Sequence, residues 1–194
     1  MGRNQIKSRY FINSESVFML TVSALFLLLS ATVLSAQETA GYRFENYKAK
    51  VIGSPKKASI NYQSNKTAKR YRTAITECYN LSDANFAGHY IVCLWGCGTG
   101  CQDGAMVDLT DGKVYDVPLG EARYFFGCDF KADEDCLDFR ADSRLFITQI
   151  CIQSRSTDTI DIQEKEFFIN VWNEKTKTFE FLRSVKSSEI IESD

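Results

Sequence analysis

Short segments dominated by apolar and aromatic residues recur through the second half of the chain, separated by turn-forming residues. The first of them, residues 86–95 (FAGHYIVCLW), is apolar enough to form a central strand buried on both faces. The later segments are residues 105–109, 113–117, 122–126, 136–140, 144–153, 166–172 and 178–185. Between consecutive segments lie three sequences typical of hairpin turns, namely TDG (110–112), ADS (141–143) and NEKTK (173–177). The spacing predicts antiparallel hairpins, and the lack of alternating strand and helix patterns argues against a parallel nucleotide-binding sheet.

Two earlier segments have different patterns. Between residues 42 and 51, apolar residues alternate with polar ones on either side of Asn46, which predicts a half-buried, bulged strand. In residues 65–80 the apolar side chains fall on one helical stripe, which predicts a helix capped by Asn65 or Thr67. The whole pattern predicts the α+β class: mainly an antiparallel β meander, as a curled sheet or as partial-barrel or blade-like hairpins, with one N-terminal helix.

The N-terminus has the pattern of a secretory signal peptide. Three basic residues, Arg3, Lys7 and Arg9, precede an uncharged and largely apolar run over residues 17–34, and small residues follow up to Ala36. We expect cleavage after Ala36. Residues 1–36 are then a signal peptide, and residues 37–194 form a single disulfide-containing β-rich domain that is periplasmic or secreted. Because the run approaches the roughly 20 residues that span a bilayer, an uncleaved anchor is the alternative, and only then is a membrane a partner.

Composition narrows the possible classes of protein. The chain has 194 residues, of which 44% are hydrophobic, with only 2 prolines and 11 glycines, so it is neither disordered nor fibrous. Its 23 basic and 25 acidic side chains give a net charge of -2, which leaves no broad cationic surface. We therefore expect no nucleic-acid partner.

Seven cysteines in an exported chain predict disulfide bonds. Cys97 and Cys101 enclose Gly-Thr-Gly, which is flexible enough to bring their Cα atoms to bonding distance. Local geometry gives two further candidate pairs, Cys128 with Cys136 around an acidic loop and Cys93 with Cys151 across the sheet. Cys78, on the predicted helix, would then be the odd thiol, buried as a small hydrophobic residue.

The same residues suggest redox or metal chemistry, but their spacing argues against both. Active dithiols commonly have Cys-x-x-Cys spacing at a helix N-terminus, whereas Cys97 and Cys101 enclose three residues in a strand-to-loop region. On a strand, His89 and Cys93 lie about 13 Å apart at roughly 3.3 Å per residue, too far to share a zinc ion. The acidic loop at 129–135 lacks the spacing of a calcium loop. We therefore predict no metal and no cofactor.

Catalysis has little support in the sequence. His89 is the only histidine, so any Cys–His or Ser–His arrangement has to use it. It lies in an aromatic strand, where a hydrogen-bonded structural histidine is the more frequent role. We assign no catalytic residue. The glycine- and cysteine-rich stretch supplies the candidate binding residues His89, Trp95, Cys97, Cys101 and Asp103.

The order of several motifs resembles that of a family of small, uncharacterised exported bacterial proteins. The motifs are RYRTAI (70–75), NFAGHY (85–90), WGCGTGC (95–101), VDLTDGKVY (107–115) and FRADSRLFI (139–147). The resemblance covers most of residues 61–183. It implies an exported β-rich protein and contributes no activity and no catalytic residues. The family motif requires only the pair that matches Cys97 and Cys101, so the other cysteines of this chain are a departure from it.

Together these observations predict an exported cell-envelope protein that acts as a non-catalytic binding or interaction module. The expected partner is a protein or an envelope glycan. The alternative hypothesis is an envelope thiol-redox protein or an enzyme centred on His89 and the pair Cys97/Cys101.

Overall fold

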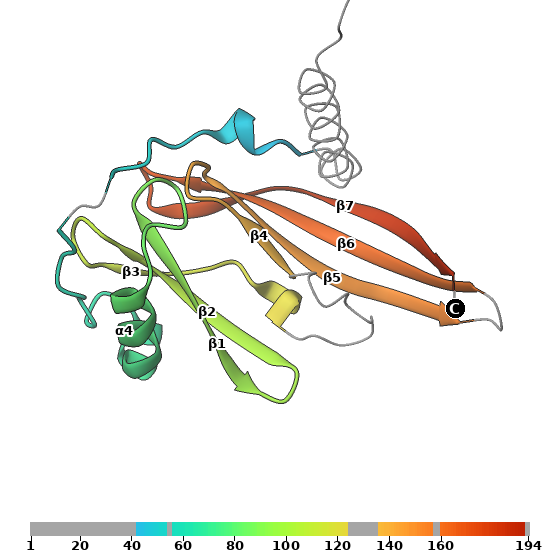
Figure 1. The fold of residues 1–194 in the computed structure, drawn as a ribbon, viewed down its shortest axis with the longest axis horizontal. Coiled ribbons are helices and arrows are strands. Elements are labelled where there is room, and N and C mark those ends of the chain that lie inside the picture. The colour runs from blue at the N-terminus through green and yellow to red at the C-terminus, as the bar shows by residue number, and fades with distance from the viewer. Residues whose placement is uncertain (1–41, 54–55, 124–135, 157–159, 193–194) are drawn as a thin grey trace, which may run out of the picture. The chain divides into compact units, whose positions relative to one another are not determined.

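The computed structural model describes residues 42–53, 56–123, 136–156 and 160–192, and it is mainly antiparallel β, as predicted (Figure 1). The first sheet contains β1 (Tyr90–Gly98), β2 (Cys101–Asp108) and β3 (Val114–Asp116), in the order β1-β2-β3. The second sheet contains β4 (Leu137–Phe139), β5 (Leu145–Ser156), β6 (Ile160–Asn173) and β7 (Thr178–Glu192), in the order β4-β5-β6-β7. Strands pair with their sequence neighbours, so the described strands form two open meanders rather than a closed barrel.

The three predicted hairpin turns are confirmed. In the β2–β3 turn, Gly112 has a φ of 72°, and its N–H donates to the carbonyl of Asp108 at 2.9 Å. The positive φ explains why glycine stands there. A backbone hydrogen bond from Ser143 closes the β4–β5 turn. In the β6–β7 turn, the N–H of Lys177 donates to the carbonyl of Asn173 at 2.8 Å.

β1 is an edge strand, whereas its composition predicts a central one. It is nevertheless buried on both faces over its first half. Ile91 and Cys93 pack against the helix α4 (Arg72–Leu81), while Tyr90 and Val92 pack against the second sheet. Because successive side chains point to opposite faces, a strand covered by a helix on one side and a sheet on the other is apolar at every position. Composition alone does not separate this case from a central strand.

The segment predicted as one helix forms two, α3 (Lys66–Arg70) and α4. Tyr71 separates them, with a φ of −111° and a ψ of 36°, outside the α-helical region. Asn65 caps α3 as predicted, because its side chain accepts a hydrogen bond from the N–H of Thr67 at 2.6 Å. Within the described residues these helices follow a 3-10 turn and an extended segment, so a single N-terminal helix is not confirmed.

The strand expected between residues 42 and 51 does not form. Phe44–Tyr47 is instead a short 3-10 helix, η1. Tyr42 and Phe44 are buried against one face of the second sheet, where they contact a cluster that includes Leu145 and Ile169. Apolar residues at alternating positions therefore anchor a turn on a sheet, and periodicity over so short a segment does not distinguish this from a strand.

The disulfide bonds confirm one predicted pair and correct another. Cys97 and Cys101 are bonded, with their Cα atoms 5.1 Å apart. Cys93 is bonded to Cys78 of α4, with a Cα separation of 5.7 Å, so the predicted pair Cys93–Cys151 and the odd thiol at Cys78 are both wrong. The reason is that Cys93 faces the helix, whereas Cys151 belongs to β5 of the other sheet, where it is itself disulfide-bonded.

Other predictions fall outside the described residues. Cys128 lies outside them, but Cys136 is described and forms no disulfide bond, so the predicted pair Cys128–Cys136 is wrong. Residues 122–126, predicted as a strand, begin in the 3-10 helix η2 (Gly120–Arg123), and the rest are not described. The signal peptide and its cleavage after Ala36 also stay predictions. No helix in the described part of the chain is long and apolar enough to cross a membrane.

Candidate functional site

His89 is held by a three-residue loop between Phe86 and Tyr90. The backbone groups of Phe86 and Tyr90 bond to each other in both directions, at 3.0 and 3.1 Å, and close this loop. Ala87 has a φ of 42° and Gly88 a φ of 87°, so two consecutive residues are left-handed. An alanine in that region is strained, and such strain tends to persist at functional sites, where the surrounding structure enforces it. The loop thus fixes the position of the chain's only histidine.

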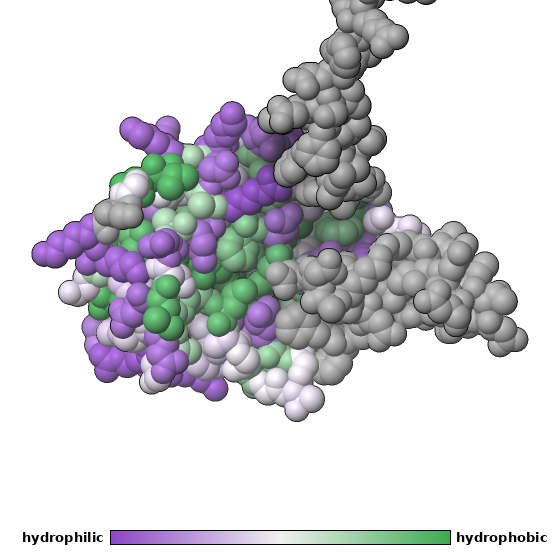
Figure 2. All heavy atoms as spheres, in the orientation of Figure 1, coloured by the Kyte–Doolittle hydropathy of each residue, from purple (hydrophilic) through white to green (hydrophobic). Residues whose placement is uncertain are grey.

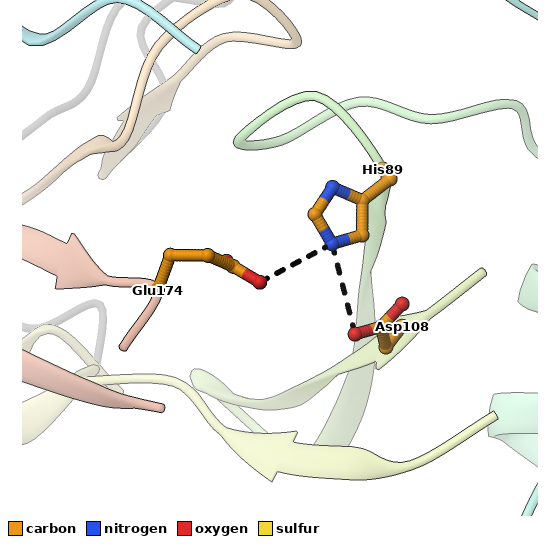
Figure 3. Close-up of side chains that lie close together, drawn as sticks. All are labelled: His89, Asp108 and Glu174. Carbon is orange, nitrogen blue, oxygen red and sulfur yellow. Dashed lines mark ion pairs between the residues drawn. The ribbon is translucent and has the colours of Figure 1, made fainter. Parts of the chain in front are cut away.

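Two carboxylates from different sheets meet this histidine (Figure 3). Nε2 of His89 lies 3.7 Å from Oδ2 of Asp108 and 3.5 Å from Oε1 of Glu174. Asp108 ends β2 and has a side chain only 2% exposed, whereas Glu174 lies in the β6–β7 turn with 43% of its side chain exposed. The other ring nitrogen of His89 points away from both carboxylates (Figure 3). The group therefore joins the first sheet to a turn of the second.

Lys177 supplies a positive charge to the same group. Its ammonium nitrogen bonds to Oε1 of Glu174, lies 3.4 Å from Oδ2 of Asp108 and donates to the hydroxyl of Tyr90 at 2.6 Å. The residue has a φ of 57°, which makes it the second non-glycine residue with left-handed backbone among those described. We define the cluster as His89, Asp108, Glu174, Lys177 and Tyr90. Of the two strained residues, Lys177 belongs to it and Ala87 lies two residues before His89.

Hydrogen bonds from neighbouring groups fix the orientation of both carboxylates. The backbone N–H and the hydroxyl of Thr110 donate to Oδ1 of Asp108 at 2.8 and 2.6 Å, which turns Oδ2 toward the cluster. Glu174 accepts hydrogen bonds from the hydroxyl of Tyr90 at 2.8 Å and from Nε1 of Trp172 at 2.8 Å. Neither carboxylate can turn without breaking these bonds.

The same contacts set the ionisation of the cluster. Burial by itself would raise the pKa of Glu174, but hydrogen bonds from Lys177, Tyr90 and Trp172 outweigh it and hold that pKa below its usual value. Burial, the hydrogen bond to Glu174 and the charge of Asp108 raise the pKa of Tyr90 far above its ordinary value, so its hydroxyl remains a donor. Burial would lower the pKa of Lys177, but the neighbouring carboxylates raise it, so the ammonium stays charged.

A pocket of 450 Å³ lies beside the cluster: Lys177 belongs to both, and Trp172, which donates a hydrogen bond to Glu174, lines the pocket. Aromatic residues of two sheets line it: the ring centroid of Trp172 is 5.3 Å from that of Tyr115 and 5.0 Å from that of Phe179. The polar lining is supplied by Ser64, Asn65, Lys113, Asp116, Lys177 and Thr178. Half of the lining residues are thus polar and half are apolar or aromatic, so the pocket offers a ligand both hydrogen-bonding groups and apolar contact.

The candidate residues from the sequence do not form one site. His89 precedes β1, whereas Cys97 and Cys101 close the far end of the β1–β2 hairpin, about 26 Å away at roughly 3.3 Å per residue. Trp95 and Asp103 are cross-strand partners nearer that far end. An enzyme that uses His89 together with the cysteine pair therefore has no geometric basis.

Asp103 and Trp95 make contacts of their own. Asp103 lies 3.2 Å from the guanidinium of Arg123. The ring of Trp95 packs on that of Tyr71, with centroids 4.9 Å apart. These contacts link the hairpin to η2 and to the residue between the two helices, and a binding role for either side chain stays a prediction.

Sequence reasoning missed Asp108, Glu174 and Lys177. The turn sequences that contain or adjoin them were recognised, but a turn motif gives no information about its contacts with distant residues. The hydroxyl of Tyr90 reaches Glu174 across 84 residues of sequence. Asp108 and Glu174 come together at His89 only because the two sheets pack together, and the sequence does not show this packing.

Comparison with protein-family models, with curated proteins and with solved structures finds no match for the chain. The resemblance to small exported bacterial proteins therefore stays a prediction. The site is interpreted from its own geometry.

Proposed function

We propose that the protein is an exported, non-catalytic binding module of the cell envelope, and that it binds an oligosaccharide segment of envelope glycan in the pocket beside the cluster. The observation that carries the proposal is this pocket of 450 Å³, in which aromatic rings and hydrogen-bonding groups converge. A concave site of that size suits a small ligand or a short glycan segment better than a folded partner protein.

The aromatic lining supports a saccharide ligand. Tyr115 and Phe179 are half-buried, and Trp172, only 1% exposed, lies behind them. Exposed ring faces offer apolar contact to the C–H face of a sugar, and a tyrosine hydroxyl adds a polar group at the rim. Burial raises the pKa of Tyr115, which keeps its hydroxyl protonated and able to donate.

The polar lining supports the same class of ligand. Lys113 at the rim has 53% of its side chain exposed, and its ammonium lies 2.9 Å from Oδ2 of Asp111. Asp116 uses Oδ1 to accept a hydrogen bond from Thr67 at 2.8 Å. Amine and carboxylate groups placed around apolar rings match the hydroxyl groups that surround the apolar face of a sugar.

The cluster is suited to support rather than to turnover. Lys177 and Tyr90 bond to each other and to Glu174, so these groups hold the β6–β7 turn against the first sheet. That turn carries one wall of the pocket.

In the view of Figure 2, hydrophobic residues form scattered patches between hydrophilic ones, and such scattered patches are normal on a protein surface.

Export is supported by the disulfide bonds Cys78–Cys93 and Cys97–Cys101, which persist in oxidising compartments. The signal-peptide pattern and the motif resemblance point the same way. All three are compatible with an envelope location.

The test is calorimetric titration of the purified, oxidised protein with soluble oligosaccharide fragments of bacterial cell-wall glycan. We expect Tyr115→Leu, which removes the ring while retaining bulk, to weaken binding about tenfold, the cost of one lost aromatic contact. Lys113→Met should weaken it less, because that side chain is at the rim. Lys175→Met, in the same β6–β7 turn but outside the pocket, is the matched control and should leave affinity unchanged.

Two outcomes would refute the proposal. One is that the fragments fail to bind to a protein whose circular dichroism shows it to be folded. The other is that Tyr115→Leu and Lys175→Met bind the fragments with the affinity of the wild type.

A further inference from the structure

We infer that His89, Asp108 and Glu174 form a binding site for a divalent transition-metal ion such as Zn²⁺, and that Lys177 competes with the ion for this site. The three ligand atoms come from three separate elements and all lie within 4.8 Å of one another. The inference does not rest on the glycan ligand proposed above, since it concerns the ligand atoms of the cluster, although Lys177 also lines the pocket.

The distances from the histidine to the two carboxylates fit one ion. Zinc binds imidazole nitrogen and carboxylate oxygen at about 2.0–2.2 Å, so two ligands of one ion are at most about 4.4 Å apart. Nε2 of His89 is 3.5 Å from the oxygen of Glu174 and 3.7 Å from that of Asp108. Ligands at tetrahedral angles are separated by roughly 3.3–3.6 Å, so the histidine is already close to such positions. The two carboxylate oxygens lie within 4.8 Å of each other, so they need to approach by up to about 1.5 Å to reach tetrahedral positions around one ion.

The outer contacts are those that support metal ligands. Ligand carboxylates are typically oriented by hydrogen bonds from neighbouring groups. Thr110 occupies Oδ1 of Asp108 and leaves Oδ2 facing the histidine. Tyr90 and Trp172 orient Glu174 in the same way. A mere surface group of acids lacks this support, and here the side chain of Asp108 is almost completely buried.

The cluster already holds a cation. The ammonium of Lys177 contacts the same oxygen atoms of Asp108 and Glu174 that face His89. An ion bound to those atoms would meet a like charge at close range, so the metal and the ammonium exclude each other. Lys177 is one-third exposed and can therefore swing its ammonium toward solvent. Affinity in the wild type is thus reduced by the work of displacing Lys177.

This competition can be tested by titrating the oxidised protein with Zn²⁺. Binding is measured by calorimetry and by NMR of the ring protons of His89. Because the chain has one histidine, its ring signals report on this site alone. We expect saturable binding of one ion that shifts these signals, and about tenfold tighter binding in Lys177→Met, because the competing charge is gone. Lys175→Met, two residues away in the same turn, should bind like the wild type.

Loss of a ligand should have the opposite effect. We expect His89→Asn and Glu174→Gln to weaken Zn²⁺ binding by at least about tenfold. Glu174→Gln is the more conservative of the two variants, because it retains the size of a half-exposed side chain. Circular dichroism establishes that each variant is folded.

The proposal is overturned if neither the wild type nor Lys177→Met binds Zn²⁺ at millimolar concentration. It is equally overturned if binding persists unchanged in both ligand variants, which would place the ion elsewhere. Since the oligosaccharide titration uses no metal, failure of one proposal is distinguishable from failure of the other.

Discussion

The two ends of the β1–β2 hairpin are built on different principles. At the tip, residues 96–101, a disulfide bond between Cys97 and Cys101 and several glycines shape an exposed turn through local contacts. At the cluster end, Tyr90 and Asp108 are cross-strand partners that are almost fully buried and bond to residues of a distant turn. The tip is conspicuous in the sequence, yet the cluster end has the strained backbone, the charges and the pocket.

This difference predicts where substitutions act. At the cluster end, a single side chain contacts both sheets, so its loss affects the whole fold. At the tip, the contacts are local, so a substitution there has a smaller effect on the stability of the fold. Unfolding experiments on matched variants of the two ends measure the contrast.

The largest effect is expected for Trp172→Ala. Trp172 is 1% exposed, packs on Tyr90, Tyr115 and Phe179, and donates to Glu174 at 2.8 Å. We expect a loss of about 3–5 kcal/mol in the free energy of unfolding, measured by urea denaturation, because the change leaves a large cavity. Trp172→Phe keeps most of the volume and should cost distinctly less. An alanine variant within about 1 kcal/mol of the wild type would contradict the view that this end joins the sheets.

The two disulfide bonds give the next contrast. Cys78–Cys93 joins α4 to β1 across a separation of 15 residues, whereas Cys97–Cys101 spans only 4. Chain-entropy arguments give about 3 kcal/mol for the longer loop and about 2 kcal/mol for the shorter one. We therefore expect the double variant Cys78→Ala/Cys93→Ala to unfold at lower urea concentration than Cys97→Ala/Cys101→Ala. The reverse order would show that the tip, and not the helix contact, is the more important constraint.

Local signals determine how much of this fold is predictable from the sequence. The β2–β3 turn is predictable because Thr-Asp-Gly needs a left-handed residue where Gly112 stands. The bond Cys78–Cys93 was not, because alternation assigns Cys93 to a face of β1 but does not say which element covers that face. The sequence shows that His89 is the only histidine, because this needs only a count of residues. It does not show that Asp108 and Glu174 lie beside His89, because that depends on which elements pack together. Packing of the two sheets decides these contacts.

A smaller effect, restricted to the cluster end, is expected at acidic pH. The pKa of Glu174 is lower in the folded protein than its usual value, so the folded state favours the ionised carboxylate. This contribution is complete above the unfolded-state pKa of about 4.3 and disappears as the pH falls through the lower folded-state pKa. We expect the urea midpoint of the wild type to fall more steeply than that of Glu174→Gln when the pH is lowered from 6 to 3. Because the side chain is 43% exposed, solvent screening keeps the difference modest. If the urea midpoints of the two proteins fall equally with pH, the hydrogen bonds to Glu174 do not favour its ionised form in the folded state.

The smallest effect should come from the tip, where two glycines provide a matched pair. An added Cβ meets nothing within 4 Å at either Gly96 or Gly98, so crowding is absent at both. Gly98 has a φ of 145°, which side chains rarely adopt, whereas the backbone of Gly96 is not in that range. We expect Gly98→Ala to lower the free energy of unfolding by about 1 kcal/mol and Gly96→Ala to stay within about 0.5 kcal/mol of the wild type. Zn²⁺ binding at the cluster end should be the same in both variants, because the tip lies at the opposite end of β1. A larger loss in Gly96→Ala than in Gly98→Ala would mean that the tip is held by contacts with other residues, and that the two ends of the hairpin are less different than their geometry indicates.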